Sequence, residues 1–536
     1  MTDFLSALPP LLQADAKAPF AIPSRPGPTG VAVVDAATAD AMEIDKLFDS
    51  INQAQTRIGQ ATLYRSLLNP PNTRNEAQAR QDAVAELVAD PALRDRLEHL
   101  VSEARRLEAD FYDLLYADFM GAISNPSHAL EIQGYGYESY SRGTRFMLEL
   151  VEAAQAVAAT PRSDYLKTIL QGIGAFAQSR AYQLMRGPVF RTEKGVCSAA
   201  EKSIWTPAVR FRPSLFKPTW LLTAAIALML AVEFVPGLLA IAASVSSLFG
   251  LFVLPLALLY IPLVGGFDRD ACIYPLRQLF RTSPEVARTL DCLGRLDELL
   301  SLVRYPEQFG QPTCLPRLAG DDTHHQLVVQ GVRNPVLGRQ NPAYVANDLS
   351  LTDEHLVVIT GPNSGGKTAF CKTLAQVQLL AQIGGYVPAE AACISIADHI
   401  FYQIPEISHL ADGEGRFGTE LRRTKEIFMA ATARSLVLMD ELSEGTTHEE
   451  KIEISLSILE GFYQKGNSTV LITHNHELAD RLLKQNKGLA RQVEFSDEQP
   501  TYRVIEGISR VSHADRVARK IGFSREDIAR YLAGKG

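Results

Sequence analysis

The chain has 536 residues, and its 53 Lys and Arg against 61 Asp and Glu give a formal net charge of −8. Its 46% apolar and 21% charged residues are typical of a folded protein, and its length corresponds to about three or four domains. The mild acidity argues against a uniformly basic nucleic-acid coat protein, although it leaves room for a local basic groove. Six scattered cysteines without a CxxC pair exclude a disulfide scaffold.

The first part of the chain is predicted to be a short tail followed by helices. Residues 1–40 form the tail, and 41–217 are expected to be the first part of a helical core domain. Helices are expected at 41–120 and 145–185, where apolar residues recur at spacings of three and four, and 124–143 is expected to be a loop. The same pattern returns at 275–303, which predicts a second helical segment over 268–322.

An apolar run separates these two helical segments. Residues 218–267 are 50 positions in which Glu233 is the only charge. Because about 20 apolar residues span a bilayer as a helix, this run is long enough for two. Trp220 and Tyr260 lie toward its ends, as in an interfacial aromatic belt. Basic residues flank the run on both sides: Arg210, Arg212 and Lys217 before it, and Arg269, Arg277 and Arg281 after it.

These features predict a transmembrane hairpin with both ends in the cytoplasm. The protein is then expected in the inner (cytoplasmic) membrane, with its remaining domains facing the cytoplasm. The alternative is a pair of core helices in a soluble protein, although soluble helices are rarely apolar on every face.

From about Gln326 the pattern changes to short β-rich runs alternating with helices. This alternation predicts an α/β domain over 323–536 with a largely parallel sheet.

A phosphate-binding loop is predicted near the start of this domain. The apolar strand 356–360 leads into G-x-x-x-x-G-K-T, and a helix follows. Glycines let backbone N–H groups close around phosphates, and the helix N-terminus adds positive potential. Lys367 is expected to reach the β- and γ-phosphates of ATP, and Thr368 to ligate Mg²⁺. The predicted nucleotide-binding residues of the loop are Gly361, Pro362, Asn363, Ser364, Gly365, Gly366, Lys367, Thr368 and Ala369. A glycine turn before an ordinary helix is the alternative.

Two later strands end in polar residues suited to phosphoryl chemistry. The apolar run 435–439 ends in Asp440, which is expected to hold Mg²⁺, and in Glu441, which is expected to orient or deprotonate the attacking water. The run 470–473 ends in His474. Such a histidine alone is more often a capping or core residue, but in this order we predict that it senses the γ-phosphate. The predicted catalytic residues are therefore Lys367, Glu441 and His474.

These segments resemble the MutS-type ATPases of DNA mismatch repair. The similar segments are ITGPNSGGKT, LLAQIGGYVPAEAACISIADHIF, LVLMDELSEGTT, LITHNHELAD and TYRVIEGISRVSHADRVARKIGF. GVRNPVL is similar to the family's RHPV element, with Asn334 in place of the histidine. The resemblance runs from about Gln326 to the end of the chain. More weakly, the stretches 56–97 and 296–312 resemble the start and the return of the family's helical lever domain, so the hairpin at 218–267 interrupts that lever.

The resemblance implies a fold, cofactors and partners. It implies a P-loop ATPase domain of the ABC type that uses ATP and Mg²⁺, preceded by an all-α lever. Two chains are expected to form a homodimer with nucleotides at the interface, and the lever to act on duplex, mismatched or branched DNA. Val345 and Tyr502 match the residues on either side of the adenine, although two ordinary core residues are an equal alternative.

The sequence also departs from the family pattern. Only about 40 residues precede the lever, so no mismatch-reading wedge domain is expected, and no C-terminal helix-hairpin-helix module is expected either. The signature that acts across the dimer is represented by Gly413, Gly415, Arg416, Phe417 and Glu420. Gly415 replaces the family's serine, and Arg416 is expected to substitute for the lost hydroxyl electrostatically.

The leading hypothesis is thus a membrane-anchored MutS-like ATPase that acts on DNA. Because Gly415 removes a hydroxyl from the signature, a nucleotide-switched membrane tether or scaffold with little turnover is the second hypothesis. A transport-type ATPase is the third, and it is disfavoured because a single hairpin is too little for a transport pathway and no LSGGQ motif occurs. The acidic balance gives DNA binding no independent support.

Overall fold

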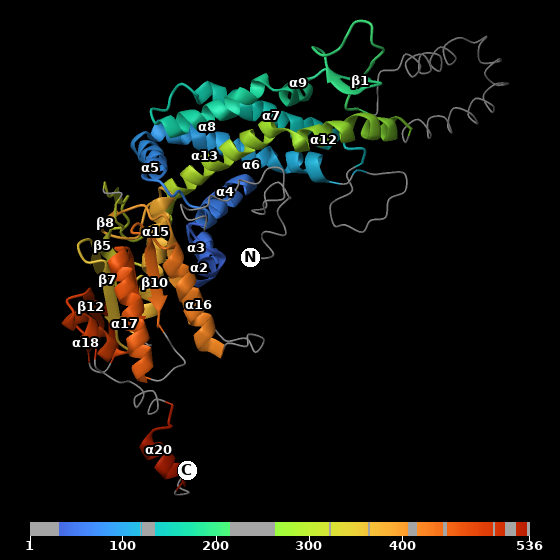
Figure 1. Ribbon diagram of the computed structural model, residues 1–536. Helices are drawn as coiled ribbons and strands as arrows, with labels where there is room; N and C mark the ends of the chain where they lie inside the picture. Colours follow the sequence, from blue (N-terminus) through green and yellow to red (C-terminus); the bar gives the residue numbers. More distant parts are fainter. Residues whose placement is uncertain are drawn as a thin grey trace, which may run out of the picture.

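The computed structural model describes residues 32–117, 119, 134–214, 263–320, 323–362, 365–405, 415–442, 448–496, 499–509 and 521–532. In these residues a long helical lever joins an α/β domain (Figure 1). The lever helices are α4 (Arg57–Leu68), α5 (Arg74–Ala89), α6 (Pro91–Tyr116), α7 (Tyr137–Val157), α8 (Asp164–Ala175), η2 (Phe176–Gln178), α9 (Arg180–Arg186), η3 (Arg269–Ile273), α12 (Tyr274–Thr282) and α13 (Pro284–Phe309).

The two longest helices, α6 and α13, have 26 residues each and begin with the same local signal. Asp90 and Ser283 are N-caps whose side chains accept hydrogen bonds from backbone N–H groups in the first turn, and a proline follows each cap. Such caps satisfy backbone donors that the helix itself leaves unpaired. Helix α6 packs against α7, and α13 packs against α4 and α8, so the lever is a bundle around these helices.

The end of the lever contains a small antiparallel sheet. Strands β1 (Val189–Thr192), β2 (Gly195–Ser198) and β3 (Val209–Arg210) are arranged in the order β2-β1-β3. The lever domain expected over 41–217 to be all-α therefore also contains this small sheet. Its strands are too short, and their burial too uneven, for an alternating pattern to reveal them.

The α/β domain is built on a six-stranded sheet with the order β13-β12-β7-β11-β10-β9. Its strands are β7 (Leu356–Thr360), β9 (Ile400–Gln403), β10 (Leu436–Asp440), β11 (Ser468–Thr473), β12 (Leu489–Ser496) and β13 (Gln499–Glu506). All neighbouring strands run parallel except β12 and β13. The predicted α/β class with a largely parallel sheet is confirmed.

Helices and a second sheet complete this domain. The helices are α14 (Leu337–Gln340), α15 (Lys367–Gln382), α16 (Gly415–Ala430), α17 (His448–Lys465), α18 (His476–Lys484) and α20 (Arg525–Leu532). The second sheet has the order β4-β8-β5-β6 and comprises β4 (Arg317–Leu318), β5 (Leu327–Val332), β6 (Asn347–Leu351) and β8 (Ala391–Ile394). Every residue of β7 and β11 is buried, so their polar ends emerge from a rigid core.

The first described residues belong to the α/β domain in space. Val34 pairs in parallel with Ile400 at the edge of the six-stranded sheet, and α2 (Ala36–Ala41) and α3 (Ile44–Ile51) follow. The Ile400 N–H donates to the Val33 carbonyl at 2.8 Å, and the Gln376 amide in α15 donates to the Met42 carbonyl at 2.8 Å. The boundary expected at residue 40 thus falls inside a segment that packs as one unit on the α/β domain.

The predicted transmembrane hairpin lies almost entirely outside the described residues, because 215–262 are not among them. Within the described part of the chain, no helix is both long and apolar enough to cross a bilayer. The hairpin stays a prediction from the sequence.

Candidate active site at the carboxyl ends of β7, β10 and β11

The loop after β7 forms close backbone approaches that need glycine. Gly361 has a φ of +139°, and Gly366 has a φ of +82° where it caps α15. A Cβ atom on Gly366 would lie 3.1 Å from Cδ1 of Tyr502, so the aromatic ring rests against the loop. Asn363 and Ser364 lie outside the described residues, while Pro362 and Gly365 flank them, joined by a 3.0 Å backbone hydrogen bond. Ala369 follows in the first turn of α15.

Lys367 turns back into this loop. Its side chain is buried, and Nζ donates to the carbonyl of Gly361 at 2.5 Å. Burial lowers the pKa of Lys367, although the nearby carboxylates of Glu441 and Asp440 act in the opposite direction. The loop therefore places a cation where its charge is poorly solvated, which favours binding of an anion such as a phosphate.

Thr368 at the start of α15 contacts Asp440 at the end of β10. The Thr368 hydroxyl donates to Oδ2 of Asp440 at 2.7 Å. A hydroxyl and a carboxylate oxygen are hard ligands of the kind that Mg²⁺ selects, and it is usually held by few protein groups together with substrate phosphates. The two residues present therefore fit the predicted magnesium site.

Glu441 is held in one orientation by the neighbouring strand. Its carboxylate accepts hydrogen bonds from the Thr473 hydroxyl at 2.9 Å and from the His474 backbone N–H at 3.1 Å, and His474 Nδ1 lies 2.7 Å from Oε1. Burial alone would raise the pKa of Glu441, but the contacts with His474 and Thr473 bring it below its usual value. The carboxylate is thus ionised and fixed in position.

Backbone strain accompanies this arrangement. Glu441 has a φ of +64°, in the left-handed region that non-glycine residues rarely adopt, and its N–H donates to the Ile472 carbonyl at 2.9 Å. Such strain persists only where the surroundings over-determine it, and it concentrates at functional sites. Sequence reasoning missed Thr473, although a threonine directly before His474 on a buried strand is a signal that could have been used.

The residues predicted for the adenine pocket lie together beside the loop. The Asn347 amide donates to the carbonyls of Tyr502, at 3.0 Å, and Val345, at 3.3 Å. Its oxygen accepts from the Val504 N–H at 2.7 Å. Tyr502 has a φ of +60°, and its ring lies against Gly366 while 51% of the residue stays exposed. Their role with adenine stays a prediction, and Asn347 is the organising residue that sequence reasoning missed.

The predicted signature residues are only partly described. Gly413 and the side chains of Gly415 and Arg416 lie outside the described residues. Phe417 is half-buried and Glu420 is buried on α16, which Gly415 begins. Helix α16 is tied to the first described segment, because Arg423 forms an ion pair with Asp35 at 2.6 Å.

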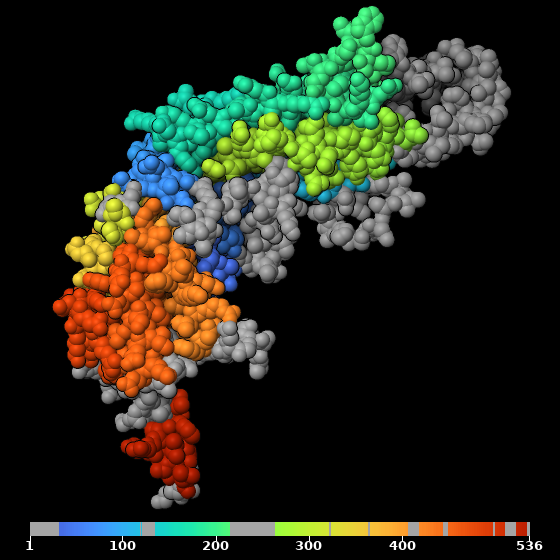
Figure 2. Space-filling model, in the orientation of Figure 1, coloured from blue at the N-terminus to red at the C-terminus, as the bar shows by residue number. Residues whose placement is uncertain are grey.

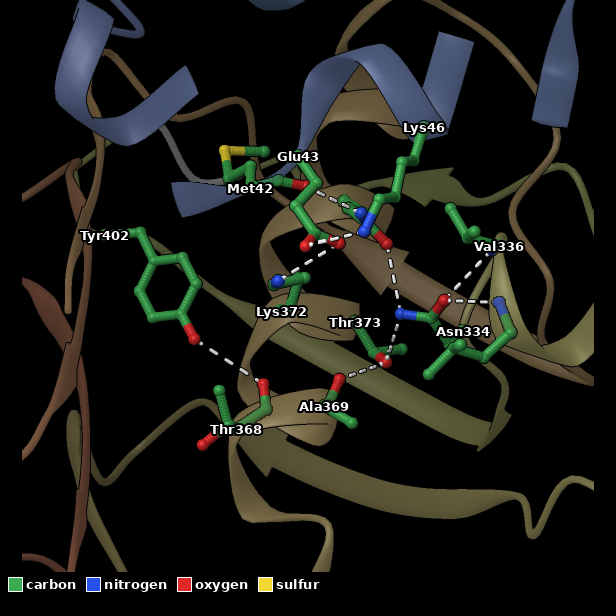
Figure 3. A network of polar contacts seen from close by, with 12 residues as sticks. Met42, Glu43, Lys46, Asn334, Val336, Thr368, Ala369, Lys372, Thr373 and Tyr402 are labelled. Carbon is green, nitrogen blue, oxygen red and sulfur yellow. Dashed lines mark hydrogen bonds and ion pairs between the residues drawn. The ribbon is translucent and has the colours of Figure 1, made fainter. Parts of the chain in front are cut away.

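A polar network joins α15 to the first described segment and to Asn334 (Figure 3). The buried Asn334 amide donates to Thr373 and Gln376 at 3.0 Å each. Its oxygen accepts from the backbone N–H groups of Val336 and Leu337. Lys372 pairs with Glu43 at 3.2 Å. All four hydrogen bonds of the Asn334 amide are satisfied, so this residue locks the helix that begins at the phosphate loop.

Comparison with known proteins gives this arrangement a family. Residues 357–531 match the family model of MutS domain V. This part of the chain is similar to MutS domain V. The match begins in β7 and includes Lys367, Thr368, Asp440, Glu441 and His474.

Curated relatives extend the similarity beyond that domain. The DNA mismatch repair protein MutS of Chlorobium phaeobacteroides is 34% identical over 272 residues, which are 49% of this chain and 30% of that relative. MutS of Parabacteroides distasonis is 33% identical over 259 residues, 46% of this chain and 29% of the relative. The DNA mismatch repair protein MSH3 of Phaeosphaeria nodorum is 34% identical over 246 residues, 43% of this chain and 21% of the relative. The chain is MutS-related, and it spans less than a third of the length of these relatives.

Proposed function

We propose that this chain is an ATPase that binds ATP with Mg²⁺ and hydrolyses it at the carboxyl ends of β7, β10 and β11. The observation that carries the proposal is the fixed, ionised carboxylate of Glu441, one residue beyond the Asp440 that meets Thr368. A structural role alone does not explain a buried, strained carboxylate beside a phosphate-type loop.

Each residue then has a distinct task. Lys367 holds the β- and γ-phosphates, and Thr368 and Asp440 hold Mg²⁺, which neutralises charge on the phosphates when bound. Glu441 accepts the proton of, or orients, the attacking water. Thr473 and the His474 backbone keep that carboxylate aimed, and the half-exposed His474 ring is placed to respond to the γ-phosphate.

Helix α15 offers a route from the nucleotide to the lever. It runs 16 residues, about 24 Å, from Lys367 to Gln382. At its far end the Gln382 amide donates to the carbonyl of Pro71 at 2.8 Å, directly before α5. A shift of the phosphate loop on nucleotide binding would therefore reach the lever through a buried, rigid helix.

The partners follow from the family. Two chains are proposed to form a homodimer around the nucleotides, and the lever to act on DNA, as the names of the relatives suggest. The segment 218–267 is proposed to anchor the chain in the inner (cytoplasmic) membrane, with the ATPase domain on the cytoplasmic side; its apolar sequence supports this.

The decisive experiment is single-turnover ATP hydrolysis by the full chain. Glu441→Gln is expected to slow hydrolysis by about 10²- to 10⁴-fold, because it removes the proton acceptor but keeps the shape. Nucleotide affinity should be retained. Glu477→Gln is the matched control, since this carboxylate pairs with Arg481 on the surface of α18.

The same experiment separates the ATPase from a nucleotide-switched tether, which Gly415 in the signature favours. If the wild-type chain binds ATP but shows no hydrolysis in a single turnover, the ATPase proposal fails and the tether stands. DNA is tested separately by salt-dependent binding to duplex, mismatched and branched DNA. Binding to all three no better than to a neutral polymer would exclude DNA as the ligand.

A further inference from the structure

The end of the lever far from the ATPase site contains a cavity lined by arginines. It has a volume of about 430 Å³ and lies between α7, α9 and the small sheet. Arg186, Arg210 and Arg212 line it, and all three are exposed. Its floor is apolar and rigid, because Val189 and Phe211 are buried there. The cavity thus combines a partly apolar base with a cationic rim, and Ser141 and Thr144 add hydroxyl groups to its wall.

These arginines are available to a ligand. Among the residues that the structure describes, none of the three forms an ion pair. The segment 180–214 contains seven basic residues and only two acidic ones, and one of those, Glu201, already pairs with Arg180. In a chain with a net charge of −8, this end of the lever is a local positive region.

Two large apolar side chains stand out from the same small sheet. Ile204 is 93% exposed and Trp205 is 92% exposed, in the loop between β2 and β3. The sheet projects from the end of the lever in the space-filling view (Figure 2). Tryptophan beside basic residues is typical of proteins that sit at a membrane–water interface, where its ring occupies the headgroup level.

The position along the chain points to the same surface. The described chain stops at residue 214 and resumes at 263, and both points lie at this end of the lever (Figure 1). The intervening 218–262 belongs to the apolar run, which is long enough to cross a bilayer twice. A membrane that holds this run would lie against the sheet and the cavity.

We propose that this end of the lever binds anionic phospholipids, with the headgroup phosphate in the cavity among Arg186, Arg210 and Arg212, and with Ile204 and Trp205 inserted into the interface. The planar guanidinium group suits a phosphate because it donates two parallel hydrogen bonds. Anionic lipids attract basic segments that lie within a few ångströms of the bilayer surface. The proposal rests on the proposed anchoring by 218–267.

The first test follows Trp205 in the full chain. Trp220→Phe leaves it as the single tryptophan, since the chain has two. In nanodiscs of phosphatidylcholine with phosphatidylglycerol, its emission is expected to shift to the blue and to be quenched by lipids with brominated acyl chains. Emission that stays water-like and unquenched in these nanodiscs would overturn the insertion of Trp205.

The second test measures the cavity without a bilayer. The full chain in detergent is titrated with dihexanoyl-phosphatidylglycerol below its critical micelle concentration. Replacing Arg186, Arg210 and Arg212 by Gln is expected to weaken binding at least tenfold and to leave ATP hydrolysis unchanged. The matched control replaces three exposed lever arginines by Gln, namely Arg96, Arg105 and Arg145. It should bind the lipid with the affinity of the wild type.

The outcomes separate this proposal from the anchoring on which it rests. Suppose that the wild-type chain does not enter nanodiscs, but the arginine replacements still weaken the binding of dihexanoyl-phosphatidylglycerol. The predicted membrane hairpin is then wrong, and the headgroup site stands. If the lipid binds the wild-type chain and the arginine variant with equal affinity, the headgroup site is wrong. If the arginine replacements weaken the binding of inorganic phosphate or duplex DNA but not the binding of the lipid, the cavity serves another phosphate ligand and the lipid proposal is overturned.

Discussion

Two regions of the molecule use buried polar groups in opposite ways. At the catalytic edge, formed by Lys367, Thr368, Asp440, Glu441 and His474, two residues are exposed and two are buried. Thr368 and His474 are exposed, whereas Lys367 is poorly solvated and Glu441 has a strained backbone. At the lever joint, where α4, α5 and α13 meet, polar side chains are sealed inside and bond one another: Thr56, Arg80, Asp297 and Glu298.

The lever joint shows how such groups are paired inside the protein, although Nε of Arg80 has no hydrogen-bond partner among the described residues. Asp297 is fully buried and accepts hydrogen bonds from the Thr56 N–H and hydroxyl at 2.7 Å each and from the Gln55 N–H at 3.1 Å. Arg80 and Glu298 form a buried ion pair at 3.2 Å. The difference indicates separate roles. Under the proposed function the rigid joint would transmit motion, and the strained, poorly solvated groups of the edge would bind the nucleotide. Changes at the joint should cost stability, and changes at the edge should cost function.

The largest loss of stability is expected from breaking the buried ion pair. Glu298→Leu leaves the Arg80 guanidinium buried without its partner, which should lower the free energy of unfolding by about 3–5 kcal/mol. The double variant Arg80→Met/Glu298→Leu should recover most of this loss because no unpaired charge remains. Denaturation followed by circular dichroism measures both. Glu103→Leu, in an exposed pair with Arg106, is the control and should change stability by less than about 1 kcal/mol. A double variant no more stable than the single one would contradict the explanation.

The catalytic edge should respond in the opposite sense. Lys367→Ala is expected to weaken ATP binding at least about 100-fold, or about 3 kcal/mol, because it removes the cation that faces the phosphates. Its thermal midpoint should not fall, since the buried ammonium is poorly solvated and burial lowers its pKa. Calorimetric titration and thermal melts give the two quantities. Lys372→Ala, one turn further along α15 and paired with Glu43, should keep its nucleotide affinity. If Lys367→Ala lowers the thermal midpoint but leaves the affinity for ATP unchanged, Lys367 stabilises the fold and does not bind the nucleotide.

Local signals in the sequence predicted the catalytic edge, and long-range packing lay beyond them. The strand before the phosphate loop was expected at 356–360 and is β7, and Asp440 and His474 lie at the ends of β10 and β11 as expected. These elements are specified by short apolar runs followed by particular residue types. In contrast, Val34 pairs with Ile400 across 366 positions, and no local pattern encodes that contact. The sheet at 189–210 was missed because its strands have two to four residues.

A close helix crossing offers a finer test of the lever joint. Helix α13 approaches α4 at Gly294, where a Cβ atom would lie 2.2 Å from the Thr62 hydroxyl oxygen and 3.0 Å from the Ile58 carbonyl oxygen. That hydroxyl is itself bonded to Ile58 at 2.7 Å and cannot simply rotate away. Gly294→Ala should therefore cost about 1–3 kcal/mol of stability through overpacking. Gly266→Ala, where nothing lies within 4 Å, is the control and should be neutral or slightly stabilising. Equal stabilities for the two variants would show that the crossing tolerates expansion.

The smallest expected effect concerns pH and a histidine buried in the α/β domain. Burial lowers the pKa of His325 to about 4, although its contact with Gln378 in α15 at 3.2 Å acts in the opposite direction. The unfolded chain, with a histidine pKa of about 6.5, then binds more protons than the folded chain between pH 6.5 and 4, so stability falls as pH drops through this window. At pH 5.5 the free energy of unfolding is lower by about 1 kcal/mol because of His325. The variant His325→Gln should not show this contribution to the pH dependence. Thermal midpoints measured from pH 7.5 to 5 compare the two chains. Parallel curves would mean that His325 is protonated within the fold, and that the core of the α/β domain can hold a buried charge as the lever joint does.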